Sequence, residues 1–234
     1  MSSSAHDKLH VILDIDETLV HYVSDKYIWH TWHLISESEQ LKYDAINLSH
    51  GLLIKRPGLD HFLRNLMTHP RIVVHIWTWS GAEYAAEIVA TLGIRAGGVV
   101  FSRRDSDASA AKYWNTKDLR YFYERVPGTS PTNTILIDDL QLNTLNYTNR
   151  HNSITVAPFA IWGRDPLRAG PYHDLSRDNV LRTLTAILRK IVKIVGRHGA
   201  QNLLSKSNVH ELHLDDYMKT FRWDDMPVHA LTVD

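Results

Sequence analysis

The stretch VILDIDETLVHY, residues 11–22, runs from apolar residues into three acidic ones, Asp14, Asp16 and Glu17. A buried strand that stops in charged residues either leaves the core there or reaches a functional site. Apolar runs without alternation are typical of strands in a parallel sheet that is covered on both faces. We therefore predict a strand over residues 9–14, with the carboxylates at its C-terminal end.

Strand-like and helix-like segments alternate along the rest of the chain. Further apolar runs of the same kind occupy residues 71–78, 97–102, 133–138 and 153–158. Helical patterns occupy residues 57–67, 80–93, 115–126 and 174–199. This alternation predicts an α/β fold, a doubly wound, Rossmann-like parallel sheet with helices on both faces.

Local signals mark the ends of two of these helices. Pro57 suits the first position of the 57–67 helix. Ser80 lies three residues before Glu83, which is the spacing of a capping box, and Gly93 is a natural C-terminal cap.

The length of 234 residues predicts one main domain with additions. Residues 22–54 interrupt the pattern and are interpreted as an insertion after the first strand. The main domain is expected to span residues 1–199, and residues 200–234 to form a C-terminal tail or a small appended element.

Composition narrows the classes of function. Lys+Arg and Asp+Glu number 26 each, so a formal net charge of zero argues against coating nucleic acid through bulk charge. The absence of cysteine excludes thiolate metal sites and cysteine nucleophiles. Without a signal peptide or an apolar run near the ~20 residues of a membrane span, we expect a soluble intracellular protein of the cytoplasm or nucleus, with no membrane partner.

Polar side chains follow three of the predicted strands, at the edge where ligands of open α/β sheets bind. These residues are Asp14, Asp16, Thr78, Asp138 and Asp139. Lys117, at the start of a predicted helix, is suited to join them. Clustered carboxylates repel one another unless a cation lies among them. Oxygen ligands favour a hard divalent ion, and Mg²⁺ is the cofactor we expect.

Such a cluster is suited to phosphoryl transfer. One carboxylate can attack phosphorus to form an aspartyl-phosphate. A second Asp two residues on, on the same side of an extended chain, can protonate the leaving oxygen and later take a proton from water. Thr78 and Lys117 can donate to the phosphoryl oxygens as charge builds. Each feature alone also fits a solvated turn or an ordinary strand end; their order on one α/β chain favours the catalytic interpretation.

Separated blocks of the chain resemble the haloacid dehalogenase superfamily, in particular the phosphatases that act on the C-terminal domain of RNA polymerase II, both the transcription-factor-associated and the small forms. The matching blocks are DIDETLVH (14–21), IKRPGLDHFLRNL (54–66), IWTWSGAEYAAEIVATL (76–92), NTKDL (115–119), ILIDDLQLN (135–143) and NSITVAPFAIW (152–162).

This resemblance implies a magnesium-dependent phosphatase, most specifically of phosphoserine or phosphothreonine in a phosphoprotein or phosphopeptide. It implies that Asp14 is the nucleophile and a metal ligand, and that Asp16 is the general acid/base and binds metal through its backbone carbonyl. Thr78 would hold the phosphoryl group and Lys117 would stabilise the phospho-enzyme. Asp138 would orient Lys117 or a metal-bound water, and Asp139 would ligate Mg²⁺; the small phosphatases often have Asn there.

Departures from the family concern the substrate. The resemblance implies that the catalytic domain is residues 1–199 and that the insertion, residues 22–54, is a candidate substrate-recognition element, although its sequence matches that of the family poorly. The segment Trp77–Ser80 places bulky residues beside Thr78, with Ser80 also a candidate substrate contact. Trp29 and Trp32 in the insertion form either an aromatic slot for substrate or a local hydrophobic cluster. Arg103 and Arg104 either contact substrate phosphate or lie in a solvated loop.

Three other interpretations are open. The fifteen histidines are scattered, and we find no convergent set for zinc. The C-terminal helix carries a basic face that is either solvated or docks an acidic partner or nucleic acid, so a phosphatase of nucleic-acid ends or small phosphometabolites is an alternative, although nucleic acid is not favoured. An inactive phosphoprotein-binding scaffold is the alternative of another class.

Overall fold

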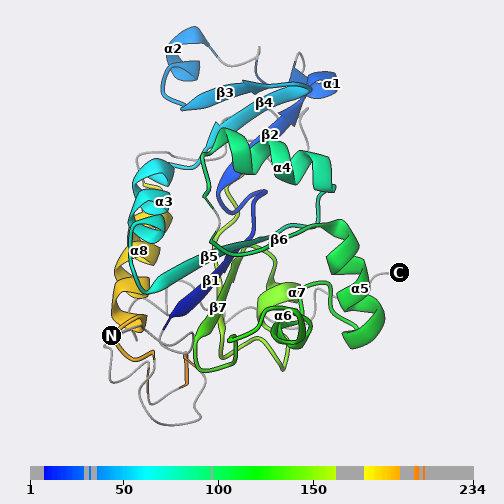
Figure 1. Cartoon of the computed structure of the whole chain (residues 1–234). Helices are drawn as coiled ribbons and strands as arrows, with labels where there is room; N and C mark the ends of the chain where they lie inside the picture. Colours follow the sequence, from blue (N-terminus) through cyan, green and yellow to red (C-terminus); the bar gives the residue numbers. More distant parts are fainter. Residues whose placement is uncertain are drawn as a thin grey trace, which may run out of the picture.

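The central sheet has five parallel strands in the order β6-β5-β1-β7-β8 (Figure 1). In this computed structural model the described residues are 8–28, 32, 36–95, 97–161, 177–195, 203–205 and 208. The strands are β1 (Leu9–Leu13), β5 (Ile72–Trp77), β6 (Val100–Phe101), β7 (Thr134–Asp138) and β8 (Ser153–Thr155). Each lies inside a predicted run, which confirms the parallel α/β architecture; β6 and β8 are shorter than predicted.

The register brings three strand ends to one edge. Leu13, the last residue of β1, is opposite Ile76 of β5 and Ile137 of β7. From β1 the chain winds outward through β5 and β6, and then returns to build β7 and β8 on the other side. This reversal beside β1 is the switch point at which open α/β sheets bind ligands.

Each face of the sheet has its own hydrophobic core. Val11 belongs to a core shared with α3 (Leu59–Met67), α4 (Ala82–Thr91) and α8 (Val180–Ile191). Its neighbour Ile12 belongs to a second core with α6 (Leu119–Arg125), because successive side chains of a strand point to opposite faces. The predicted covering of both faces is therefore confirmed.

The predicted starts of α3 and α4 are wrong. α3 begins at Leu59, and Gly58 before it has φ 81°, so Pro57 lies in a turn outside the helix. α4 begins at Ala82 after Gly81, and the Ser80 capping box does not form because the Ser80 hydroxyl donates to Asp16 instead. Gly93, with φ 62°, does end α4 as predicted.

Three further helices differ from expectation. α8 covers only Val180–Ile191 of the predicted 174–199 segment. α6 begins at Leu119, later than predicted, because the Asp118 side chain caps it by accepting from the Arg120 amide at 2.9 Å. α5 (Arg103–Tyr113) replaces the loop that was one interpretation of Arg103 and Arg104. Its polar sequence has no apolar stripe, but a capping box between Ser102 and Asp105 fixes its start.

The insertion is an antiparallel sheet in the order β2-β4-β3, above the body of the molecule in Figure 1. Its strands are β2 (Val20–Ser24), β3 (Ala45–Leu48) and β4 (Gly51–Lys55), and two short helices, α1 (Asp25–Ile28) and α2 (Glu37–Gln40), lie between β2 and β3. Ser49, between β3 and β4, donates its amide and hydroxyl to Glu87 of α4, both at 3.0 Å. The insertion is thereby tied to the helix that follows β5.

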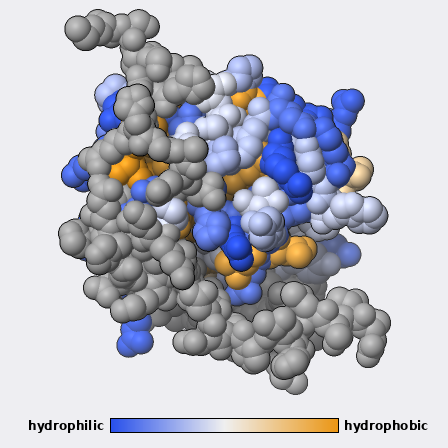
Figure 2. Space-filling model, turned by 90° about the horizontal axis from the view of Figure 1, so that it is seen from below, coloured by the Kyte–Doolittle hydropathy of each residue, from blue (hydrophilic) through white to orange (hydrophobic). Residues whose placement is uncertain are grey.

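Little of the predicted tail is described, but Leu203 and Leu204 are buried in the core shared with α3 and α8. Where the described side chains are visible in the view from below, they are mainly hydrophilic, with apolar patches among them (Figure 2). Within the described ranges, no helix has the length and apolarity needed to cross a membrane.

Candidate active site

Three carboxylates converge where β1 and β7 end. Asp14 follows β1, Asp138 is the last residue of β7, and Asp139 comes next. Each offers an oxygen, and these oxygens lie within 4.8 Å of one another. Asp14 is 6% exposed and Asp138 is 0% exposed, so solvent does little to screen the charge that gathers here.

Lys117 supplies positive charge inside this cluster. Its Nζ donates to Asp14 Oδ1 and, at 2.6 Å, to Asp138 Oδ2, and the side chain is 2% exposed. Burial alone would lower the pKa of Lys117, but Asp138 and Asp14 outweigh it and raise the pKa. Lys117 is therefore a buried cation shared by two carboxylates.

Both carboxylate oxygens of Asp138 accept hydrogen bonds from more than one described residue. Asn143 Nδ2 donates to both of its oxygens at 3.1 Å, and the Leu140 amide donates to Oδ1 at 2.8 Å. The Thr116 hydroxyl in turn donates to Asn143 Oδ1 at 2.7 Å. This network fixes Asp138 and thereby the direction in which Lys117 points.

The carboxylate oxygens of Asp14 and Asp139 accept fewer hydrogen bonds from described residues than those of Asp138. The Thr18 hydroxyl lies 3.3 Å from Asp14 Oδ2 and 3.4 Å from Asp139 Oδ1, and one hydroxyl proton cannot serve both. Burial, and then repulsion from Asp138, raises the pKa of Asp139 to about 7. Burial likewise raises the pKa of Asp14 well above its usual value, although Lys117 opposes the shift.

The charge balance suits a cation. Three carboxylates face one ammonium group, and the oxygens left to Asp14 and Asp139 are of the type that hard divalent ions bind. The cluster therefore fits a metal ion, with Asp14 and Asp139 the residues best placed to hold it.

Asp16 has a different set of partners. Ile15, between the two aspartates, is fully buried. The Asp16 carboxylate accepts from the Ser80 hydroxyl at 2.8 Å, from Tyr84 OH at 2.5 Å and from the Thr78 hydroxyl at 3.4 Å. Asp16 thus faces the segment after β5, while Asp14 faces Lys117 and Asp139.

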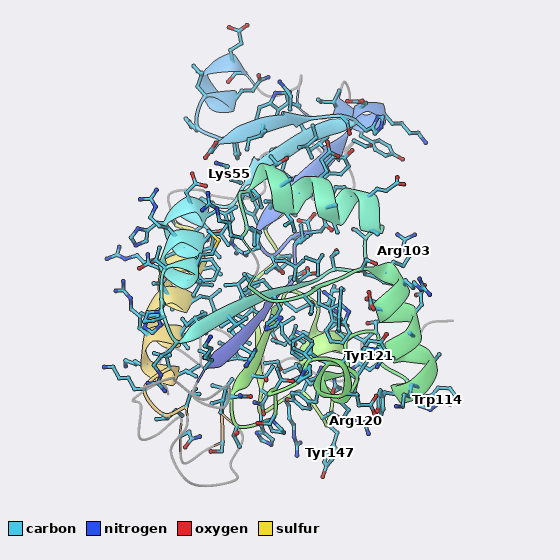
Figure 3. The ribbon with its side chains drawn as sticks, in the orientation of Figure 1. Lys55, Arg103, Trp114, Arg120, Tyr121 and Tyr147 are labelled. Carbon is cyan, nitrogen blue, oxygen red and sulfur yellow. The ribbon has the colours of Figure 1, made fainter. Side chains whose placement is uncertain are left out.

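The loop after β5 brings Thr78 and Ser80 together. Thr78 is buried, and its hydroxyl accepts from the Ser80 amide at 3.0 Å. Arg103 is at the start of α5, where Figure 3 labels it. It donates its amide to the Ser80 carbonyl and its Nε to the Trp79 carbonyl, the latter at 3.0 Å. Its guanidinium lies 6.0 Å from the centre of the exposed Trp79 ring. Arg103 is therefore beside this loop.

The remaining substrate-binding candidates are Arg104, Trp32 and Trp29. Arg104 is exposed on the first turn of α5. Trp32 packs in a hydrophobic cluster of the insertion that includes Phe159, with its ring 5.8 Å from that of Tyr43. This matches the local-cluster interpretation of Trp32, while Trp29 lies outside the described residues.

A buried arginine ties the loops around the site together. Arg56, which follows β4, donates to the Thr18 carbonyl at 3.0 Å and to the Ala157 carbonyl at 2.8 Å. Its Nε donates to Asp178, before α8, at 2.9 Å, and both side chains are 0% exposed. Burial lowers the pKa of Arg56, and the charge of Asp178 opposes that shift.

Four residues of this arrangement were not among the candidates from the sequence. They are Thr18, Arg56, Tyr84 and Asn143. All four lie inside the matching blocks, so their position there was the one available signal. Tyr84 lies on the α4 pattern, where an amphipathic helix accounts for a tyrosine equally well.

The sheet, the aspartate after its first strand and the buried lysine–aspartate pair define a phosphatase fold of the haloacid dehalogenase type. The family model described as NLI interacting factor-like phosphatase matches residues 9–196. The chain belongs to this family and is a phosphatase of phosphate esters. No curated protein matches the chain significantly.

Two solved structures share the fold. One is Fcp1, an essential RNA polymerase II CTD phosphatase, with 19% identity, a TM-score of 0.59, and coverage of 85% of this chain and 69% of that chain. The other is a variant of fission yeast Fcp1 bound to beryllium fluoride, with 18% identity, a TM-score of 0.58 and the same coverages.

Proposed function

We propose that this phosphatase hydrolyses phosphoserine or phosphothreonine in proteins, with Mg²⁺ as cofactor and Asp14 as nucleophile. The observation that carries the proposal is the Lys117 bridge between Asp14 and Asp138. It holds a buried carboxylate in place, and the charge of Lys117 favours the ionised form that attack on phosphorus requires.

In the first step an Asp14 side-chain oxygen forms a bond to phosphorus while the bond from phosphorus to the ester oxygen breaks. Asp16 gives its proton to the departing oxygen, which leaves as the serine or threonine hydroxyl. Thr78 and Lys117 donate to the phosphoryl oxygens as charge builds on them. The product on the enzyme is a phosphorylated Asp14.

In the second step water attacks the phosphorus and Asp16 takes the proton of that water. The bond between phosphorus and Asp14 breaks, inorganic phosphate leaves, and both aspartates return to their starting states. Asp14, Asp139 and the Asp16 backbone carbonyl would hold Mg²⁺, which when bound neutralises charge on the phosphoryl group. Asp138, fixed by Asn143, orients Lys117.

The proposed substrate class rests on likeness and on the insertion. The structural neighbours are phosphatases of a protein substrate, the CTD of RNA polymerase II. The insertion sheet is joined to α4, whose first turns follow Ser80, so a peptide held there would lie near the loop that carries Thr78. We propose this sheet as the substrate-recognition element, and Arg103, which lies beside the loop after β5, as a further contact for substrate.

The test compares three phosphate esters with and without a chelator. We expect hydrolysis of a phosphoserine peptide to exceed that of a 3′-phosphorylated oligonucleotide and of nucleoside monophosphates, and EDTA to abolish all three. Asp14→Asn keeps the size of the side chain and leaves Lys117 paired with Asp138, so the variant should lose hydrolysis while remaining folded and unfolding cooperatively. Undiminished turnover by Asp14→Asn would refute the proposed nucleophile.

The same assay decides between the alternatives. Faster turnover of the oligonucleotide or nucleotides would identify the nucleic-acid or metabolite phosphatase instead. On the basic face of α8, Arg189 donates a hydrogen bond to Asn65 Oδ1 of α3 at 2.6 Å. This contact favours a structural role for Arg189 over binding of nucleic acid. Phosphopeptide binding without turnover would identify the scaffold.

A further inference from the structure

Asp16 receives its two shortest hydrogen bonds from one short segment, Ser80 to Tyr84. Ser80 Oγ donates to Oδ2 at 2.8 Å, and Tyr84 OH donates to Oδ1 at 2.5 Å. Each carboxylate oxygen therefore has its own hydroxyl donor, which fixes both the position and the rotation of the carboxylate plane.

Tyr84 is itself held in place from two sides. It lies on the first turns of α4, a ten-residue helix. Its ring contacts the ring of Tyr22, on β2 of the insertion sheet, edge to face at a centroid distance of 5.2 Å. The Tyr22 hydroxyl donates to the His50 carbonyl at 2.6 Å, between β3 and β4. The phenol that reaches Asp16 is thus supported by the helix on one side and by the insertion on the other.

From this geometry we propose that Tyr84 is a positioning residue for Asp16, holding the carboxyl where it delivers a proton to the leaving oxygen. The inference deepens the proposed function, since it rests on Asp16 as the proton donor. Tyr84 contacts neither the carboxylate cluster nor Lys117 through any hydrogen bond of the described residues, so its effect passes through Asp16 alone.

Misplacing a proton donor has a specific kinetic consequence. An ester with a poor leaving group needs the proton in the transition state, whereas a nitrophenolate leaves well without it. Loss of the Tyr84 hydroxyl should therefore slow a poor leaving group selectively. Phenyl phosphate and 4-nitrophenyl phosphate make a suitable pair because they have nearly the same shape and differ mainly in the acidity of the phenol released.

The experiment measures kcat/KM for both esters, because this constant reports the step that forms the phospho-enzyme. For Tyr84→Phe we expect roughly a tenfold or larger loss with phenyl phosphate and less than about a twofold loss with 4-nitrophenyl phosphate. Ser80→Ala should show the same selectivity. Tyr121→Phe is the matched control, because Tyr121 is in the α6 core and its hydroxyl lies 3.5 Å from Asp105; its ratio between the esters should equal that of the wild type.

The outcomes separate the two proposals. If the wild type hydrolyses 4-nitrophenyl phosphate and Asp14→Asn does not, the proposed chemistry is supported independently of Tyr84. An equal loss of both esters in Tyr84→Phe, or no loss of either, overturns the positioning role. Thermal unfolding of Tyr84→Phe near the wild-type temperature confirms that the ratio reports on catalysis and not on folding.

Discussion

Replacing Lys117 by Met should destabilise the protein strongly and make its stability depend on magnesium. The substitution keeps a long apolar stem but removes the charge between Asp14 and Asp138, whose side chains are 9% and 0% exposed. Breaking a buried ion pair by removing one partner costs about 3–5 kcal/mol, because the remaining charge stays buried. For a protein of this size, that corresponds to a Tm roughly 6–20 °C lower.

Magnesium should return part of this loss. A ligand at 100 times its Kd stabilises the folded state by about 2.7 kcal/mol. In Lys117→Met the ion would face the three carboxylates without a competing ammonium group, so Mg²⁺ should raise the Tm of the variant more than that of the wild type. The assay is thermal unfolding by calorimetry, in EDTA and in excess MgCl₂.

Lys112→Met is the matched control. Lys112 also makes a lysine–carboxylate pair, with Glu124 at 2.7 Å, but its side chain is 52% exposed and solvent screens the pair. Its Tm should stay near the wild-type value in both buffers. If Lys117→Met and Lys112→Met unfold at the same temperature in EDTA, the account of Lys117 as a buried, shared cation is wrong.

Three further predictions concern pH and the insertion. Asp139→Asn should stabilise the metal-free protein at pH 8 and not at pH 4. The pKa of Asp139 is about 7 in the folded protein against an ordinary value of 3.8, so the wild type loses stability as pH rises between those values; urea unfolding in EDTA checks the difference. His75 Nε2 lies 3.0 Å from His10 Nδ1, and burial lowers the pKa of His75 to about 3, so His75 makes the wild type lose stability as pH falls from 6.5 toward 3. His75→Gln should therefore lose less stability over that range than the wild type does; an unchanged acid profile would contradict this. Gly51→Ala places a methyl carbon 2.3 Å from the Val23 carbonyl oxygen and should distort the insertion sheet, raising KM for a phosphopeptide but not for 4-nitrophenyl phosphate; equal KM changes would argue against peptide recognition there.

The positions of the site residues were predictable where they follow from sheet topology. Parallel strands end at one edge, so Asp14, Thr78 and Asp138 had to lie near one another once the strands were recognised. Lys117 was predicted at a helix start and is instead two residues before α6, because Asp118 takes the cap. The Lys117 ammonium group still reaches the site, because the turn before α6 places it there.

What escaped prediction depends on contacts between distant segments. α5 has no apolar stripe, because its buried positions include Ser106 and Ser109, which pack without a hydrophobic signal. Tyr84 gains its importance from one hydrogen bond to Asp16, which is distant in the sequence. Asn143 gains its importance by joining Asp138, which it contacts through both carboxylate oxygens, to the hydroxyl of the more distant Thr116. No spacing within their own segments marks them, because ordinary tyrosines and asparagines occupy similar positions on surface helices and turns.

Through the guanidinium of Arg56, the region before α8 can affect catalysis from outside the carboxylate cluster. This guanidinium joins Asp178 to the carbonyl of Thr18, whose own hydroxyl lies between two of the acidic groups. In a mutational survey scored by turnover alone, lesions at Asp178 would resemble lesions at the nucleophile. Inherited or engineered changes at that remote position would thus pass for catalytic defects until protein abundance and folding were measured separately.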